Sequence, residues 1–341
     1  MPLLDIGYRA WKGPLSPSWT RCWVVTSTGI SLVWKGTWIR RLLVLLTFPS
    51  MAAAIMVGIF EQYLSEPTAQ QAISIFEESP QAQSMNRMLE NSGLDIDEVK
   101  GDPQKARHFV WSYVLFSLFR YPQAFGMILL VGLVASRLIS FDMRSRGYLL
   151  YLSRPLTSAE YVLGKAGVLF ILVFLVATVP ALVIYLLGLF LSTNSWAIWD
   201  TWDIPVRILF ASIILILPTS AIALALSSLT QESRYAGFAW FSIWLLGHVA
   251  YQSLWAANAI QSGGGRMGRR GNRERDLQYW EETASQFMYL SPYELLGHLQ
   301  KKAFGLLASD APLLLPILVV LGITILGYWV AYWRVSRMLK Q

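Results

Sequence analysis

Side chains that can bind charged groups are concentrated in one stretch, residues 140–165. It reads SFDMRSRGYLLYLSRPLTSAEYVLGK and joins two long apolar segments. Its Arg and Lys side chains can pair with carboxylates or phosphates on another molecule. A short basic loop between two segments of membrane-crossing length is expected on the cytoplasmic side. We therefore interpret the stretch as a docking element that a cytoplasmic protein could grip.

The three histidines, His108, His248 and His298, do not lie in a known catalytic motif. None lies in an HExxH zinc pattern, and the sequence has no G-x-S-x-G nucleophile turn. No catalytic residue is therefore predicted, although an intramembrane enzyme that uses His248 or His298 stays open as an alternative. Cys22 is the single cysteine, which excludes an internal disulfide and a multi-cysteine zinc site. No metal site is predicted.

The composition indicates an all-α polytopic membrane protein. Only 14% of the 341 residues are charged, 55% are hydrophobic, and the mean hydropathy is +0.44, whereas soluble domains have about 25% charged residues. Several apolar runs approach the roughly 20 residues that cross a bilayer as a helix. The net charge of +7 is explained by Lys and Arg at a cytoplasmic membrane rim. Membrane lipid is therefore an expected partner, and nucleic acid is not.

Six transmembrane helices are predicted, with the N- and C-termini cytoplasmic. The first 41 residues hold six Lys and Arg but one acid, whereas residues 61–107 hold nine acids and four Lys and Arg. Positive charge marks the cytoplasmic side, so the first span runs outward. The expected spans are 42–60, 122–139, 166–191, 205–229, 236–255 and 311–333. External segments are 61–121 with a helical hairpin, 192–204 and 256–310; cytoplasmic segments are 1–41, 140–165, 230–235 and 334–341.

The second span is interrupted by Arg120 and Pro122. We expect 109–119 to form a separate helix near the outer interface, with the crossing at 122–139. If Arg120 instead lies in the bilayer, it needs a partner and becomes a candidate functional residue.

An amphipathic helix is predicted over 18–39, before the first span. At about 100° per residue, Trp19, Trp23, Ile30 and Trp34 fall within roughly 60° of one another. Tryptophan favours the headgroup boundary, so we expect this helix to lie on the inner membrane surface. An ordinary packed helix or an irregular segment is the alternative.

Energy for any transport would have to come from another protein. The predicted spans hold almost no acids and show no internal repeat, which argues against an ion-coupled carrier. The pair Gly164-Lys165 resembles the end of a phosphate-binding loop, but Ala166 follows where Ser or Thr is needed. Glu160 also stands where such a loop has glycine. The chain is therefore not expected to bind ATP through this pair.

The central stretch resembles the signature region of ABC-2 type permeases, the membrane subunits of ATP-binding cassette exporters. An Asp-containing basic segment is followed by Ser153-Arg154-Pro155-Leu156-Thr157-Ser158, then by Glu160-Tyr161 and Gly164-Lys165. The six-span layout and the amphipathic helix also match the ABC-2 type exporter fold. Within the motif, a proline interrupts helical structure, a Ser or Thr at 157–158 can cap the next helix, and an acid suits its first turn.

The resemblance implies partners and roles. A cytoplasmic ABC ATPase would bind ATP and Mg, with no cofactor on this chain, and a second permease subunit, identical or paralogous, would complete the exporter in the cell (inner) membrane. Arg154 and Glu160 would contact the ATPase, while Arg144 and Arg146 would contact the ATPase or lipid phosphate. The alternatives are that these residues only anchor a loop, or that the chain is a non-transporting scaffold bound to an ATPase. The implied coupling residues are Arg144, Arg146, Arg154, Pro155, Glu160, Tyr161, Gly164 and Lys165.

Overall fold

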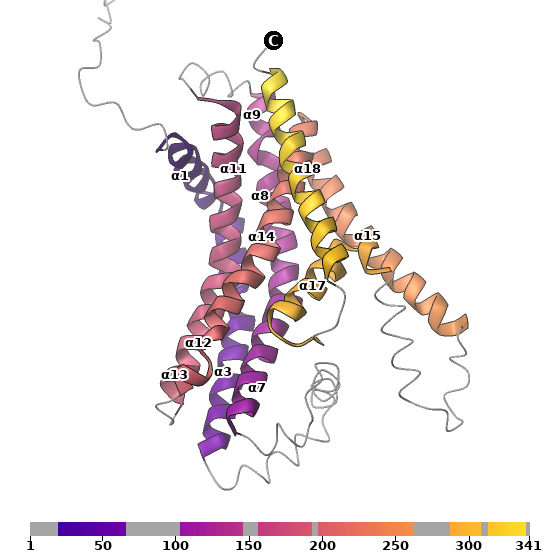
Figure 1. Ribbon diagram of the computed structural model, residues 1–341. Coiled ribbons are helices and arrows are strands. Elements are labelled where there is room, and N and C mark those ends of the chain that lie inside the picture. Colours follow the sequence, from indigo (N-terminus) through magenta and orange to yellow (C-terminus); the bar gives the residue numbers. More distant parts are fainter. Residues whose placement is uncertain are drawn as a thin grey trace, which may run out of the picture.

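The computed structural model describes residues 20–65, 103–145, 156–192, 197–261, 287–307 and 313–338. The regular structure in these ranges is entirely helical, as the sequence predicts for an all-α membrane protein. Long helices run side by side along the bundle, and shorter helices lie against its flank and at one end (Figure 1). Of the predicted external segment 61–121 with its helical hairpin, residues 66–102 lie outside the described residues.

Within the described residues, five helical segments are long and apolar enough to cross a membrane. They contain the first four of the expected spans and overlap the last, 311–333. The remaining expected span, 236–255, lies in α15 (Ser233–Gln261), a helix of 29 residues that carries more polar side chains. The five segments are Thr37–Gln62, Gln104–Arg144, Ser158–Leu191, Asp203–Leu229 and Leu314–Met338.

The spans are assembled from consecutive helices. The first span comprises α2 (Thr37–Leu45) and α3 (Thr47–Ser65). The second span comprises α7 (Pro103–Leu118), the π-helix η1 (Phe119–Gln123), α8 (Ala124–Leu138) and α9 (Ser140–Arg144). The third comprises α11 (Ser158–Val173), the π-helix η2 (Phe174–Thr178) and α12 (Val179–Leu191), and single helices α14 (Asp203–Leu229) and α18 (Leu314–Met338) follow. Shorter helices are α1 (Thr20–Trp34), α13 (Ala197–Asp200), η3 (Met288–Leu290) and α17 (Pro292–Ala303).

The second span differs from the prediction, because residues 109–119 do not form a separate helix. Residues 109–118 belong to α7 and Phe119 begins η1, through which the helix continues into α8 without a break. Pro122 lacks the N–H that an α-helix needs, and the wider π-helical turn accommodates it. The hydroxyl of Tyr293 donates a 2.8 Å hydrogen bond to the Arg120 carbonyl. This bond ties the π-helical turn to the beginning of α17.

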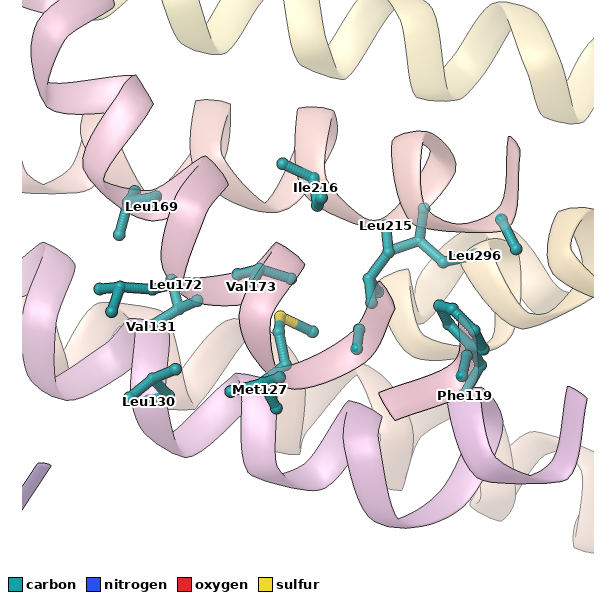
Figure 2. Packing of buried hydrophobic residues seen from close by; sticks show 14 of the residues in the cluster. Phe119, Met127, Leu130, Val131, Leu169, Leu172, Val173, Leu215, Ile216 and Leu296 are labelled. Atoms are coloured by element: carbon teal, nitrogen blue, oxygen red, sulfur yellow. The ribbon is translucent and has the colours of Figure 1, made fainter. Parts of the chain in front are cut away.

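The core surrounds α14, which packs against α8, α11, α15, α17 and α18. Figure 2 shows buried aliphatic side chains of α8, α11 and α14 pointing toward one another, with Phe119 at the η1 end. On the α18 side, a Cβ on Gly327 would lie 2.8 Å from the Ala221 backbone. Glycine at this position therefore lets the two helices touch. Large apolar side chains such as Phe190 and Leu314 remain exposed, as expected for a surface that faces lipid.

Candidate functional site

The motif residues meet at one end of the bundle. Here α9 lies beside the beginning of α11, close to the C-terminal end of α18, and α1 lies along the flank of α11 (Figure 1). The turn at 230–232, between α14 and α15, is also here, because its Glu232 pairs with Arg144 of α9. We call this region the α9–α11 end.

A capping box starts α11. Thr157 is the N-cap, and its hydroxyl accepts a hydrogen bond from the Glu160 amide at 3.2 Å. The Glu160 carboxylate in turn accepts one from the Thr157 amide at 2.7 Å. This reciprocal arrangement satisfies two backbone donors that an uncapped helix would leave open. The cap expected from the sequence is confirmed, and α11 runs from it into the span without a separate short helix at the rim.

A buried ion pair fixes α9 to α11. The ammonium group of Lys165 lies 2.7 Å from a carboxylate oxygen of Asp142, and the Tyr161 hydroxyl donates to the same oxygen at 2.7 Å. Tyr161 and Lys165 are only 3% and 5% exposed. A buried charge is stable only when paired and hydrogen-bonded. These side chains therefore hold α9 and α11 together within the chain.

Small residues bring α1 into close contact with α11. A Cβ on Gly164 would lie 2.6 Å from the Cβ of Val25, and one on Gly29 would lie 2.5 Å from Val168. The hydroxyl of Thr26 donates to the Gly164 carbonyl at 2.9 Å. The backbones approach this closely because side chains are missing at the crossing. Gly164 is thus a packing residue for α1.

Two further ion pairs lie at the α9–α11 end, and their side chains are at least partly exposed. Arg21 of α1 approaches the Glu160 carboxylate at 4.0 Å. Arg144 of α9 pairs with Glu232 at 3.0 Å, and both side chains are exposed. Exposed pairs contribute little stability, about 0–1 kcal/mol, so Arg144 can exchange its partner at low cost.

The predicted site residues separate into three groups. Tyr161, Gly164 and Lys165 are buried within the chain, whereas Arg144 and Glu160 face outward at least in part. Arg146, Arg154, Pro155 and Trp19 lie outside the described residues.

The predicted interface helix exists as α1, although it spans 20–34 and a turn before Gly36 separates it from α2. Trp23 and Trp34 are 59% and 50% exposed, as expected for side chains at a membrane boundary. Ile30 instead packs against the core. Of the three described residues, Ile30 therefore does not share the exposure of Trp23 and Trp34, because α11 covers the side of α1 that carries Thr26 and Gly29.

The single cysteine can report on the contact between α1 and α11. Burial and the nearby Glu160 carboxylate raise the pKa of the Cys22 thiol. A raised pKa leaves less reactive thiolate near neutral pH, so maleimide labelling should be slow there and accelerate as the pH rises. Glu160→Gln keeps a capping side chain but removes the charge, and we expect labelling about two- to threefold faster. Equal rates in both proteins would contradict this electrostatic contact.

Two polar clusters at the opposite end were not predicted. Arg107 donates two hydrogen bonds to Glu61, at 2.9 and 3.0 Å, and Trp111 donates a third at 3.1 Å. Glu61 is 1% exposed. The sequence places both charges beside an acidic segment, which suggests solvated surface. Only the contact of α3 with α7 shows that they form a buried pair.

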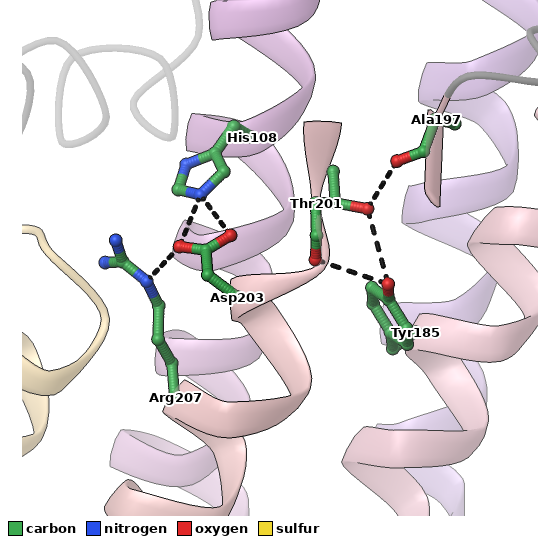
Figure 3. A network of polar contacts seen from close by, with 6 residues as sticks. All are labelled: His108, Tyr185, Ala197, Thr201, Asp203 and Arg207. Atoms are coloured by element: carbon green, nitrogen blue, oxygen red, sulfur yellow. Dashed lines mark hydrogen bonds and ion pairs between the residues drawn. The ribbon is translucent and has the colours of Figure 1, made fainter. Parts of the chain in front are cut away.

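The second cluster ties α7 and α12 to the beginning of α14 (Figure 3). His108 lies 3.0 Å from both carboxylate oxygens of Asp203, which also accepts a 2.6 Å hydrogen bond from Arg207. Tyr185 donates to the Thr201 carbonyl at 3.2 Å. The four-residue spacing of Asp203 and Arg207 was a usable sequence signal. Within the described residues, no three His, Cys, Asp or Glu side chains converge as metal ligands.

Arg120 has the partner that a cation inside the bundle requires. Its guanidinium donates to the Tyr293 carbonyl at 2.6 Å, pairs with the Glu294 carboxylate and stacks on the Tyr293 ring at 3.6 Å. A Cβ on Gly297 would lie 2.5 Å from this guanidinium. The arginine therefore holds α17 against η1. His248 of α15 faces the other Glu294 oxygen at 3.5 Å.

A groove of about 900 Å³ lies between α8 and α15, and the Arg120–Glu294 pair forms part of its wall. Aromatic side chains make up half of the lining. The lining residues are Arg120, Tyr121, Phe125, Ile128, Leu129, Phe241, Trp244, Leu245, His248, Tyr251, Gln252, Trp255, Tyr293 and Glu294.

Helical spans and a structured motif at one end define a polytopic membrane protein with a candidate docking end. A comparison with known protein families matches residues 34–338 to the family described as ABC-2 family transporter protein. The chain therefore belongs to this family and is a permease of the ABC-2 type. A search of curated proteins gives no match.

Proposed function

We propose that this chain is the permease subunit of an exporter that a separate cytoplasmic ABC ATPase drives. Membership of the ABC-2 family supports the class. The coupling role is supported by two contacts that join α1, α9 and α11 at the α9–α11 end, and we call these three joined helices the frame. There, Asp142–Lys165 ties α9 to α11, and Thr26–Gly164 ties α1 to α11. The segment that joins α9 to α11 contains the predicted docking loop, so force applied to the loop would act on all three helices together.

In this proposal ATP and Mg bind to the partner, and the permease responds mechanically. Closure of the ATPase pushes on the loop and on α1, and the rigid frame transmits the movement to the spans. Arg144, Arg146, Arg154 and Glu160 are the proposed contacts with the ATPase. Tyr161, Gly164 and Lys165 act through the frame. A second permease subunit, identical or paralogous, lies beside this one in the cell (inner) membrane, with all termini cytoplasmic.

Affinity capture tests the proposal. The tagged protein is purified from membranes in a mild detergent, its companions are identified, and ATP hydrolysis is assayed. We expect an ABC ATPase in near-equal amount. A chain that purifies alone and without hydrolysis would contradict the proposal. An ATPase that is retained but never stimulated by substrate would indicate a scaffold.

Charge reversal in the loop tests the docking contacts. Glu160→Lys and Arg154→Glu should each reduce the captured ATPase by about tenfold, because opposite charges at the contact become like charges. Glu160→Gln is the matched control for the cap, and the amount of permease in the membrane controls for insertion. Normal capture by both reversed variants would remove these residues from the contact.

A further inference from the structure

The groove between α8 and α15 is shaped as a wedge. At its narrow end the helices touch, because a Cβ on Gly132 would lie 2.7 Å from Trp240 and 2.6 Å from Phe241. The Trp240 ring nitrogen donates to the Ile128 carbonyl at 2.9 Å. Toward its C-terminal end α15 leans away from the bundle (Figure 1). At this wide end α17 fits between the walls, with Gly247 close to the Leu290 carbonyl.

The side chains that line both walls of the wedge change from apolar to polar at the same level. Near the narrow end, α8 contributes Phe125, Ile128 and Leu129, and α15 contributes Trp244 and Leu245. Toward α17 the lining becomes polar on each side. The polar part consists of Arg120, His248, Tyr251, Gln252, Tyr293 and Glu294.

The charges at the polar end compensate each other. Arg120 is engaged by Glu294 and by the Tyr293 carbonyl, so neither charge is left to bind a net opposite charge on a ligand. What remains for recognition is hydrogen bonding by Gln252, His248 and Tyr251 beside aromatic faces. An uncharged or zwitterionic polar group fits this end, and an apolar tail fits the narrow end.

We propose that the groove binds a single-tailed amphipathic lipid whose head is uncharged or zwitterionic, and that this is the substrate class of the permease. The substrate assignment rests on the proposed export function, whereas lipid binding by the groove can be measured without the ATPase. The head lies beside the Arg120–Glu294 pair, and the tail lies along Trp244 and Leu245. The groove's volume is within the usual range for small-molecule sites, roughly 300–1,000 Å³.

Photo-crosslinking in phospholipid nanodiscs tests this assignment. The probe is a lysophosphatidylcholine with a diazirine in its tail, and crosslinked peptides are mapped. We expect saturable labelling of 125–129 and 241–245. Excess unlabelled lysophosphatidylcholine or monoacylglycerol should compete, and lysophosphatidylglycerol or an alkyl trimethylammonium should compete about tenfold less well. Equal competition by the charged lipids would overturn the head assignment.

Two adjacent leucines provide a matched pair. Leu245 and Leu246 are each 64% exposed, but only Leu245 lines the groove. Leu245→Asn should reduce saturable labelling by about tenfold, because it places an amide beside the tail. Leu246→Asn should leave labelling within twofold. Labelling that does not saturate, or that falls equally in both variants, would mean annular lipid only. If the ATPase is captured but labelling does not saturate, the lipid assignment is contradicted and the export proposal is not.

Discussion

Replacing Lys165 with methionine is expected to lower the free energy of unfolding by about 3–5 kcal/mol, because the Asp142 carboxylate, whose side chain is only 15% exposed, then loses its cation. The ammonium and carboxylate are 2.7 Å apart, and Lys165 is 5% exposed. Among the described residues, Asp142 would keep the hydrogen bond from Tyr161 alone. Thermal unfolding of the purified permease in detergent measures the loss.

The exposed pair at the same end is the control. Arg144→Gln removes the ion pair with Glu232, whose side chains are 65% and 44% exposed, and should cost less than about 1 kcal/mol. The double variant Asp142→Asn with Lys165→Met should recover part of the loss, since no isolated charge remains. If Lys165→Met were no more destabilising than Arg144→Gln, the buried pair would not hold α9 to α11.

Substituting Gly164 with leucine is expected to separate α1 from α11 and to abolish coupling, with ATPase-driven transport falling by about tenfold or more. The Cβ of the new side chain would lie 2.6 Å from the Cβ of Val25 and 3.0 Å from the Cys22 carbonyl oxygen. Overpacking of this kind costs typically about 1–3 kcal/mol. The steric clash is confined to the contact between α1 and α11. We therefore expect α1 to dissociate from α11 while the membrane spans stay packed. Faster maleimide labelling of Cys22 is the structural readout.

The glycine at 322 supplies the matched control, because a Cβ there would meet nothing within 4 Å. Gly322→Leu in α18 should therefore leave both labelling and transport unchanged. Val25→Gly added to Gly164→Leu should restore part of the contact, because it removes the Cβ that the new side chain would meet at 2.6 Å. Slow labelling of Cys22 in Gly164→Leu would show that α1 stays in place and that the glycine is not required for the crossing.

Local features of the fold could be predicted from the sequence, because their determinants are close together in the chain. A cap at 157–158 and an acid in the first turn were predicted, and the three-residue spacing of Thr157 and Glu160 also permits the capping box that the structure shows. The need of Arg120 for a partner was also foreseeable from its apolar surroundings. Its partner was not, since Glu294 lies 174 residues away and no periodicity connects them.

The motif shows why roles are harder to predict than positions. Spacing locates Tyr161, Gly164 and Lys165 at the start of a helix, but it does not reveal which helix approaches them. Their resemblance to the family motif implied a role in coupling to an ATPase, which stays a prediction. In the structure they hold α1 and α9, because Gly164 is the crossing point and Lys165 is buried on Asp142.

The π-helices η1 and η2 divide two spans at the same level, because they contact each other. Each π-helical turn holds one residue more than an α-helical turn. Conversion of either turn to α-helix would rotate the rest of that helix by about 100° and shift it by about 1.5 Å along its axis. A movement that starts at α9 or at the capped end of α11 therefore reaches a joint before it reaches α7 or α12. Under the proposed coupling mechanism, α8 and α11 would turn while α7 and α12 keep their side-chain contacts.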